Sequence, residues 1–329
     1  MKVLVTGGAG YIGSHVVRQL AEAGHDIVVF DNLSTGYRWA VTAGELVVGD
    51  LTNEEEIEQV FSRHDFEAVL HFAANIVVPE SVTNPLKYYS NNTRNTLNLL
   101  KAVDRHKVPY MVFSSTAAVY GMPEETVLTE DLPLAPINPY GASKMMSERM
   151  MMDLAAATSL NYVILRYFNV AGANPDGLLG QATPDATHLI KVACECVTGQ
   201  RDGMSVFGTD YDTRDGTCIR DYIHVEDLAR AHVMALDYMA RGGESQVLNC
   251  GYGRGFTVRE VIDVVKAESG LNFPVQETGR RAGDPAALMA DNTRIKDVLG
   301  WEPEHDDLET IVRTALAWEK IWQQKKAAG

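Results

Sequence analysis

Tyr140 and Lys144 are four residues apart in the segment NPYGASK, at the start of a stretch with helical periodicity. In a helix this spacing places both side chains on one face. An unperturbed tyrosine titrates near ~10, and a shift of about 3 units, worth roughly 4 kcal/mol, would make it a base at neutral pH. A buried cation beside the phenol favours such a shift, so the pair predicts proton-transfer chemistry. Because the same spacing also occurs by chance on helix surfaces, the rest of the chain has to decide between the two interpretations.

The segment SSTAAVYG supplies a second group of polar side chains. Ser114, Ser115 and Thr116 follow the apolar run YMVF, and Ala117 and Ala118 come next, at positions where an enzyme could have carried acids. The segment therefore indicates chemistry that uses hydroxyl groups without a neighbouring carboxylate.

The segment TGGAGYIG has the glycine spacing of a dinucleotide-binding turn. It follows the first predicted strand, opens a helix, and contains both Gly8-x-Gly10-x-x-Gly13 and Gly7-x-x-Gly10-x-x-Gly13. Glycine is needed where the backbone turns sharply and approaches a pyrophosphate, whose charge then rests at the helix N-terminus. Asp31 ends the next strand 18 residues after Gly13, where a carboxylate can bind both hydroxyls of an adenine ribose and would repel a 2′-phosphate. The pattern predicts NAD as the cofactor rather than NADP.

Short β-branched runs alternate with amphipathic segments through the first half of the chain. The runs are KVLVTG, DIVVFD, ELVVGD, EAVLHFAA, YMVFSS and YVILRYFN, and the predicted helices cover 11–23, 54–63, 91–105 and 140–158. This alternation predicts an α/β fold with a doubly wound parallel Rossmann-type sheet. Active sites in such sheets lie at the carboxyl ends of the strands. Here the strands end in small or polar residues: Gly7, Asp31, Asp50, Phe72 with Ala73 and Ala74, Ser114 to Thr116, and Asn169.

The second half of the chain has a looser pattern. Residues 175–216 are rich in Gly, Asp and Thr, with one predicted helix around 188–198, and we expect this region to cap a ligand site. The segment IRDYIHVEDLARAHVMAL then shows helical periodicity and is expected to pack against the first lobe. We therefore expect an NAD-binding Rossmann domain (1–174 plus about 220–240). It interleaves with a smaller C-terminal α+β substrate-binding lobe (about 175–219 and 241–329).

Helix ends are marked by capping residues at two places. Thr52 with Glu55, and Thr257 with Glu260, have the spacing of capping boxes, and Gly270 is a predicted helix stop. Residues 307–324 are predicted to form a terminal amphipathic helix.

Composition limits the possible partners. The chain has 329 residues and a formal net charge of -15, which argues against a broad nucleic-acid surface or an anionic membrane surface. Its four cysteines lack zinc-type spacing and are too sparse for a disulfide scaffold, so no metal site is expected. Because the first apolar segment is interrupted early by glycines and no run approaches the ~20 residues of a spanning helix, we expect a soluble cytoplasmic protein.

Seven motifs spread over nearly the whole chain carry a family resemblance. TGGAGYIGSH, HFAA, SSTAAVYG, NPYGASK, RYFN, RDYIHVEDLA and RRAGD resemble the extended short-chain dehydrogenase/reductases, and specifically the UDP-galactose (UDP-glucose) 4-epimerases. The resemblance implies that Tyr140 is the base, that Lys144 positions the nicotinamide ribose and lowers the tyrosine pKa, and that Thr116 relays the proton of the sugar 4-hydroxyl. It also implies that NAD oxidises C4 to a ketone, and that the sugar turns before hydride returns to its other face.

The two alanines separate this chain from close relatives. Nucleotide-sugar 4,6-dehydratases carry Asp-Glu directly after the threonine, because elimination of water needs an acid and a base there. Ala117 and Ala118 leave a site that can remove and return a hydride but has nothing to drive elimination.

The resemblance also implies the ligand-binding residues. For NAD these are Gly7, Gly10, Tyr11, Ile12, Gly13, Asp31, Asn32, Asp50, Leu51, Phe72, Ala73, Ala74, Asn91, Ser114, Tyr140, Lys144 and Phe168. For the UDP-sugar they are Thr116, Asn169, His188, Leu189, Phe207, Arg220, Arg281, Asp284 and Leu288, with the two arginines on the pyrophosphate, Asp284 on the uridine ribose and Phe207 beside the uracil. A homodimer through the helices that begin at Asn91 and Tyr140 is implied as well.

Two departures from the family pattern leave the sugar open. Ile76 stands where many bacterial members have lysine, and Leu288 where glucose/galactose-specific members often have tyrosine. A UDP-pentose or UDP-uronate 4-epimerase is therefore an alternative, as is a catalytically silent NAD-binding sensor. Such a sensor would be expected to have lost Tyr140 or Lys144, and both are present.

Overall fold

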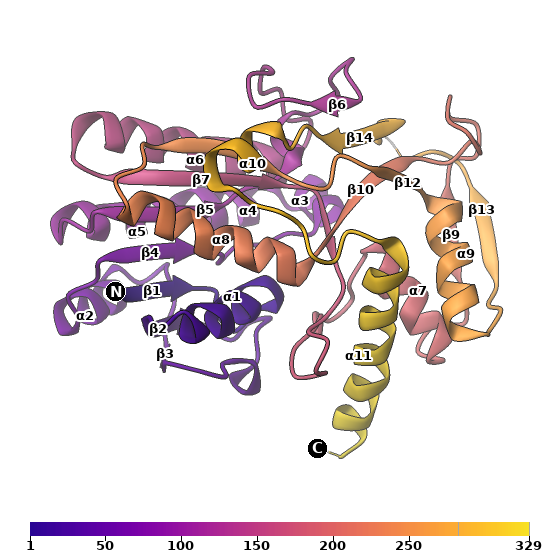
Figure 1. The fold of residues 1–329 in the computed structure, drawn as a ribbon, viewed down its shortest axis with the longest axis horizontal. Coiled ribbons are helices and arrows are strands. Elements are labelled where there is room, and N and C mark those ends of the chain that lie inside the picture. The colour runs from indigo at the N-terminus through magenta and orange to yellow at the C-terminus, as the bar shows by residue number, and fades with distance from the viewer. Residues whose placement is uncertain (282, 329) are drawn as a thin grey trace.

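The computed structural model describes residues 1–281 and 283–328, and its larger part is built on a seven-stranded parallel sheet (Figure 1). The strands, in the order in which they lie side by side, are β11 (Gln246–Cys250), β7 (Asn161–Tyr167), β5 (Tyr110–Ser114), β4 (Ala68–His71), β1 (Lys2–Thr6), β2 (Asp26–Asp31) and β3 (Glu45–Val48). All neighbouring pairs are parallel. Because the order runs outward from β1 in both directions, the predicted doubly wound sheet is confirmed.

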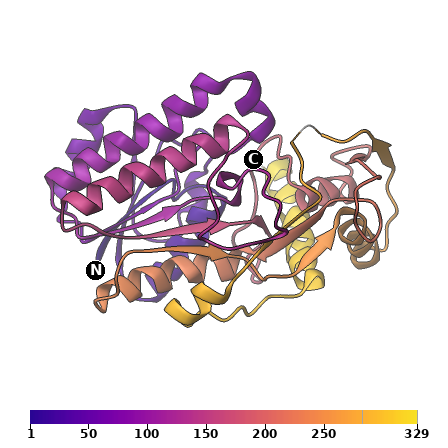
Figure 2. The ribbon, with the colours of Figure 1, turned by 90° about the horizontal axis from the view of Figure 1, so that it is seen from above.

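Helices cover both faces of this sheet, as the view from above shows (Figure 2). One face carries α2 (Glu54–Arg63), α5 (Asn95–Arg105) and α6 (Pro139–Ala157), and the other carries α1 (Tyr11–Glu22) and α8 (Val225–Ala240). The helix predicted at 140–158 is α6, and it lies on the opposite face of the sheet from α8.

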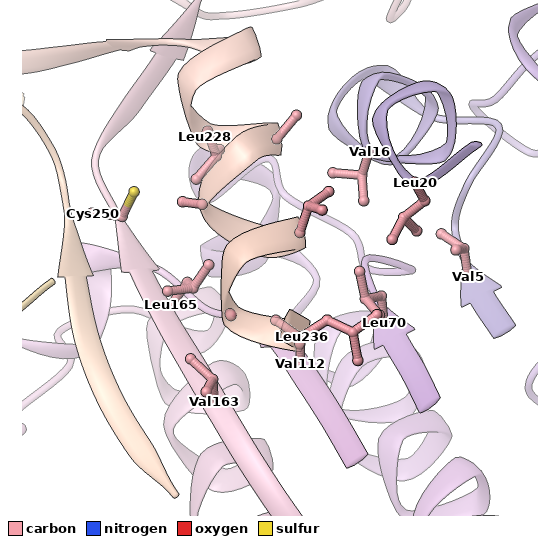
Figure 3. Packing of buried hydrophobic residues seen from close by; sticks show 14 of the residues in the cluster. Val5, Val16, Leu20, Leu70, Val112, Val163, Leu165, Leu228, Leu236 and Cys250 are labelled. Carbon is pink, nitrogen blue, oxygen red and sulfur yellow. The ribbon is translucent and has the colours of Figure 1, made fainter. Parts of the chain in front are cut away.

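Alternate residues of each strand pack against opposite layers. Val5 of β1 packs in one buried cluster with Val16 of α1 and Leu236 of α8 (Figure 3). The neighbouring Leu4 packs in the other cluster, which includes Met151 of α6. Burying each side chain of this size contributes roughly 1.5–3 kcal/mol. The two-sided burial explains why the strands are continuous apolar runs, and it fixes where their polar carboxyl ends emerge.

A second, smaller lobe lies beside the sheet, on the right of Figure 1. Its central strand β10 (Ile219–His224) pairs with β8 (Asn169–Ala171), β12 (Gly255–Thr257) and β14 (Ala287–Ala290), and β14 pairs with β6 (Val127–Leu128). The other elements here are β9 (Met204–Phe207), β13 (Val275–Thr278), α7 (Leu189–Val197), α9 (Val258–Ser269) and α11 (Leu308–Ala328), whereas α10 (Thr293–Leu299) packs against the large sheet beside α8. Among the described helices, none is both long and apolar enough to cross a membrane.

The approach to α5 is more irregular than predicted. Two short helices, α3 (Val78–Thr83) and α4 (Pro85–Tyr88), lead into a π-helical segment (Tyr89–Arg94) before α5 begins. The remaining short elements are 3₁₀ turns at Arg38–Ala40 and Ala117–Val119.

Helix-end predictions had mixed outcomes. Thr257 and Glu260 form the predicted capping box of α9, and Gly270 ends this helix in the left-handed conformation, so both predictions are confirmed. The Thr52–Glu55 capping box is wrong: Asn53 caps α2 instead, accepting hydrogen bonds from the backbone N–H of Glu55 and Glu56. Because α2 begins at Glu54, the N-cap position belongs to Asn53, whose side-chain oxygen can reach the N–H groups of the second and third helical residues.

Two segments in the second half fold differently from the prediction. The first six residues of IRDYIHVEDLARAHVMAL form β10 rather than a helix, because they pair with strands that are distant in the sequence. The loop region 175–216 contains β9, which pairs with the distant β13. The division into two interleaved lobes stays a proposal, and within it β11, which falls in the range 241–329, extends the first sheet.

Candidate active site

A large cleft opens at the carboxyl ends of the large sheet's strands and is closed on its other side by the second lobe. Its volume is about 1580 Å³. A pocket for one small molecule usually measures about 300–1,000 Å³, so this cleft has room for two ligands. All predicted site residues except Ser114 and Lys144 line it, whether they were predicted for the cofactor or for the substrate.

The glycine turn after β1 is shaped for close approach to a phosphate. Gly7 has φ of +74°, and a Cβ there would lie 2.5 Å from the backbone nitrogen of Ala73. A Cβ on Gly13 would lie 2.3 Å from the carbonyl oxygen of Gly7, so only glycine fits either position. The N-cap of α1 is Gly10, which offers no side-chain cap, and the first turn carries no acidic residue. The N–H groups at this helix start are therefore available to an anion.

Asp31 lies at the end of β2, beside the glycine turn. Its side chain accepts hydrogen bonds from the backbone N–H of Ala9 (3.0 Å) and of Leu33 (2.8 Å). Burial raises the pKa of this carboxyl above its usual range, although both backbone bonds act in the opposite direction. Asn32 donates to Asp50 at 2.8 Å at the neighbouring strand end. Together with the glycine turn, these acceptors fit the adenosine half of a dinucleotide.

Lys144 lies behind the cleft wall, where it holds the end of β5. Its Nζ donates to the carbonyl oxygen of Ser114 at 2.8 Å and lies 4.8 Å from the centre of the Phe113 ring. Burial lowers the pKa of Lys144 to about 7, while the nearby Glu148 acts to raise it. The Ser114 hydroxyl is hydrogen bonded to the Tyr167 hydroxyl at 2.8 Å. These contacts explain why Ser114 and Lys144 do not themselves line the cleft.

Tyr140 and Thr116 both line the cleft. The start of α6 is fixed by Asn138, whose side chain accepts a hydrogen bond from the backbone N–H of Gly141 at 2.8 Å, and this places Tyr140 in the first turn. Burial raises the pKa of Tyr140, and a side-chain hydrogen bond with Thr116 acts to lower it. Both side chains line the same cleft, as a proton relay between them requires. A lowered pKa of Tyr140 stays a prediction for the NAD-bound protein.

The far end of the cleft combines two arginines, an aspartate and an aromatic ring. The Arg281 guanidinium lies 3.7 Å from the centre of the Phe207 ring. Arg220 donates to Asp284 at 2.6 Å, and Leu288 is its register partner on β14. Such an arrangement suits a diphosphate held by guanidinium groups, with a flat ring beside Phe207.

Asn169 and His188 lie between these two ends. The Asn169 side chain donates to the backbone carbonyl of Asp221 at 3.2 Å. His188 precedes α7, and its Nδ1 is paired with the Gln181 side chain at 2.9 Å. Burial lowers the pKa of His188, so a neutral ring faces the cleft. Leu189 follows it at the start of α7.

Known proteins place this arrangement in a family. The family model described as "NAD dependent epimerase/dehydratase family" matches residues 3–251, well over half of the chain. The chain belongs to this family. A UDP-glucose 4-epimerase of Azospirillum brasilense is 57% identical over 324 residues, which cover 98% of this chain and 93% of that relative.

Solved structures of family members share the whole fold. The UDP-glucose 4-epimerase of Brucella ovis in complex with NAD has a TM-score of 0.93 and 45% identity, covering 96% of this chain and 97% of that one. The UDP-Glc/GlcNAc 4-epimerase of Campylobacter jejuni has a TM-score of 0.86 and 51% identity, covering 97% and 99%. The predicted α/β fold and the predicted family are therefore confirmed.

Within the epimerase/dehydratase family, the residues after Thr116 indicate which reaction the cleft can support. Ala117 and Ala118 both line the cleft, in the 3₁₀ turn directly after Thr116. Neither can donate or accept a proton, so the acid and base that elimination needs are not supplied from these positions.

Sequence reasoning missed several residues that line the cleft or support it. Tyr167 and the loop 183–187 line it, and Glu148 and Arg166 lie buried directly behind the Ser114–Thr116 segment. Glu148 carried a usable signal, because it follows Lys144 by four residues on the face that Tyr140 and Lys144 share. The loop 183–187 belongs to the region 175–216 that was expected to cap a ligand site, and only its individual residues were not named.

Proposed function

We propose that this chain is an NAD-dependent 4-epimerase of UDP-sugars that interconverts UDP-glucose and UDP-galactose. The observation that carries the proposal is that Tyr140 and Thr116 line one cleft together with the glycine turn, Asp31 and the two arginines. The identity of 57% with a UDP-glucose 4-epimerase supports the choice of sugar.

In this proposal, each residue of the site has a separate role in the reaction. Tyr140 accepts the proton of the sugar 4-hydroxyl, with Thr116 as the hydroxyl through which the proton passes. Lys144, whose Nζ is bonded to the Ser114 carbonyl behind the cleft wall, is assigned the role that the resemblance implies, which is to position the nicotinamide ribose and to favour the phenolate. Bound NAD supplies reversible hydride transfer at C4. Arg220 and Arg281 hold the diphosphate while the oxidised sugar turns, so that the proton and hydride return to give the other epimer.

The proposed cofactor site lies at the carboxyl ends of β1 and β2. We assign the pyrophosphate to the turn at Gly7, Gly10 and Gly13, and the adenosine ribose to Asp31. Both groups present unused hydrogen-bonding capacity to the cleft, in the form of helix N–H groups and a carboxylate. The remaining NAD-binding and sugar-binding residues keep the roles that the resemblance implies.

A homodimer is part of the proposal. Leu97 of α5 and Met146 of α6 are 42% and 40% exposed, on helices that lie side by side on one face of the sheet (Figure 2). Pairing of these helices across a two-fold axis would cover both side chains in one isologous interface. Light scattering at micromolar concentration should give the mass of a dimer, and a monomer mass would contradict this part.

We also propose that the protein acts in the cytoplasm. Cys194, Cys196, Cys218 and Cys250 are all buried free thiols, which suits a reducing compartment.

The function is tested by incubating the purified protein with a panel of UDP-sugars and no added cofactor, and separating the epimers by chromatography. The proposal predicts that UDP-glucose and UDP-galactose approach the same equilibrium mixture from either side. Conversion of pentoses or uronates alone would favour the second candidate, which Ile76 supports because an apolar residue lines the cleft where many bacterial relatives have a cation. No conversion of any sugar would favour a silent NAD-binding sensor.

A further inference from the structure

A buried ion pair lies behind the proton-relay residues. The side chains of Glu148 on α6 and Arg166 on β7 are only 1% and 4% exposed. Arg166 donates to both carboxylate oxygens, with Nη2 2.7 Å from Oε2 and Nε 3.1 Å from Oε1. Burying two charges costs several kcal/mol per ion even when they pair, and apolar residues in their place are often as stable. The stability of the fold does not therefore explain why a charged pair occupies this position.

The pair is bonded to both ends of the segment that carries Thr116. The Ser115 hydroxyl donates to Glu148, directly before Thr116. At the other end, Arg166 Nη1 donates to the Tyr120 hydroxyl at 3.1 Å, and its guanidinium lies 5.1 Å from the centre of the Tyr120 ring. Thr116 therefore sits in a short turn whose two flanks are held by one ion pair.

The same pair is tied to the helix that carries the base. Tyr140, Lys144 and Glu148 are spaced by four residues along α6, so they share one face. Lys144 holds the Ser114 carbonyl and Glu148 holds the Ser115 hydroxyl. Through two consecutive turns, one face of α6 thus contacts Ser114 and Ser115, the two residues directly before Thr116, and Tyr140 lies one turn before Lys144 on this face.

We propose that the Glu148–Arg166 pair positions the Thr116 hydroxyl against Tyr140 for proton transfer at the sugar 4-hydroxyl. The inference rests on the proposed function and adds positioning residues to it. Neither Glu148 nor Arg166 lines the cleft, so each acts through Thr116 and not on the substrate. Misplacement of a reacting group by about 1 Å can cost ~10²-fold in rate, which makes the arrangement measurable.

The test is a double-mutant cycle between the pair and Thr116, read as kcat and KM for UDP-galactose. Glu148→Gln and Ser115→Ala should each lower kcat by about 10–100-fold with KM changed less than about twofold, because the fault lies in the reacting geometry. In the Thr116→Ala background, each should cost less than about threefold, because the group that they position is already absent. Equal losses in both backgrounds, or an unchanged kcat in the single variants, would overturn the inference.

Two controls separate positioning from a loss of folding. Ser115→Ala leaves the ion pair intact and removes one hydrogen bond, so it is informative even where Glu148→Gln fails to fold. Asp227→Asn alters another buried carboxylate, on α8 at the opposite face of the sheet, and should lower the melting temperature without lowering kcat. A wild-type protein that converts no UDP-sugar would overturn the proposed function and this inference together, whereas an active protein without the coupling would overturn the inference alone.

Discussion

Two regions of the cleft are built in different ways: the region at the end of β5, called the chemical end below, and the region of Arg220 and Arg281, called the nucleotide end. At the end of β5, a buried network surrounds the reacting hydroxyls, in which Lys144, Ser115 and Glu148 are each less than 4% exposed. At the nucleotide end, Arg220 and Asp284 form a pair whose side chains are 13% and 33% exposed, and Arg281 lies across Phe207. The comparison teaches that the chemistry depends on preorganised, desolvated groups, whereas recognition uses separate side chains that can be changed one at a time.

The largest effect is expected at the chemical end. Tyr140→Phe and Lys144→Ala should keep the fold but lower kcat by ~10²–10⁴-fold, the usual contribution of a general acid-base group, and Thr116→Ala should lose less. Steady-state kinetics with melting temperatures as the control for folding would measure this. A Tyr140→Phe variant with the wild-type rate would mean that the mechanism is wrong.

A substitution at the nucleotide end should change KM rather than kcat. Arg281→Ala removes a charged hydrogen-bond donor, worth about 1.5–3 kcal/mol, so KM should rise roughly 10–100-fold while kcat stays within about twofold. Arg280→Ala is the matched control, because that adjacent arginine is bonded to Asp210 at 2.7 Å and does not line the cleft. If Arg281→Ala lowered kcat and left KM unchanged, the claim that recognition and chemistry depend on separate regions of the cleft would be contradicted.

The free energy of unfolding should fall in acid, because His71 near the chemical end is buried as a neutral ring. Its ring lies under the strand ends, bonded to Thr6 (2.6 Å) and Thr96 (2.9 Å). Burial, with a smaller effect of the Lys144 charge, lowers the pKa of His71 to about 3. An unfolded histidine titrates near ~6.5, so between these values the unfolded state binds more protons. The free energy of unfolding should therefore fall as the pH drops below ~6.5, by up to about 1.4 kcal/mol per pH unit.

Urea unfolding of the wild type and His71→Asn at pH 7 and pH 5 measures this effect. The variant should lose less stability between the two values than the wild type does. His305 in the second lobe provides a control of opposite sign, because its bond to Asp227 raises its pKa. It stabilises most below ~6.5 and loses this contribution as the pH rises. The gap between the wild type and His305→Asn should therefore widen at pH 5. A wild type and a His71→Asn variant with equal pH dependence would contradict the prediction for His71.

The smallest effect is expected at Leu288, which lines the cleft beside Arg220. If the proposed function holds, a side chain here would limit the bulk that a turning sugar can carry at C2. Leucine is shorter than tyrosine, yet it fills more space than a cysteine or serine. We expect efficient interconversion of UDP-glucose and UDP-galactose with weak activity on UDP-N-acetylglucosamine, and a fall in the latter for Leu288→Tyr. The ratio of kcat/KM for the two sugars measures this, and a ratio unchanged by Leu288→Tyr would remove Leu288 from the account of specificity.

Features that can be recognised within a few neighbouring residues were predicted from the sequence, whereas features that depend on contacts between distant residues were not. The glycine turn, the Tyr140–Lys144 spacing and the apolar runs of most large-sheet strands can be recognised within a few residues of sequence, and the structure has them as predicted. The strand at Ile219–His224 was mistaken for helix, because it lacks such a run and only its pairing with strands some tens of residues away in either direction marks it as a strand. The Glu148–Arg166 pair was missed for the same reason: the spacing of Glu148 was visible, but only the packing of α6 on β7 brings the arginine to it.

The central claim is that a hydride leaves C4 and returns to the same carbon while the buried network moves only the hydroxyl proton. UDP-glucose deuterated at C4, incubated with the purified protein and no added cofactor, tests it most directly by nuclear magnetic resonance. The account predicts UDP-galactose that retains the deuterium at C4, with equal retention in the UDP-glucose that remains. Deuterium exchanged for solvent hydrogen at C4, or UDP-glucose left unconverted, would contradict it.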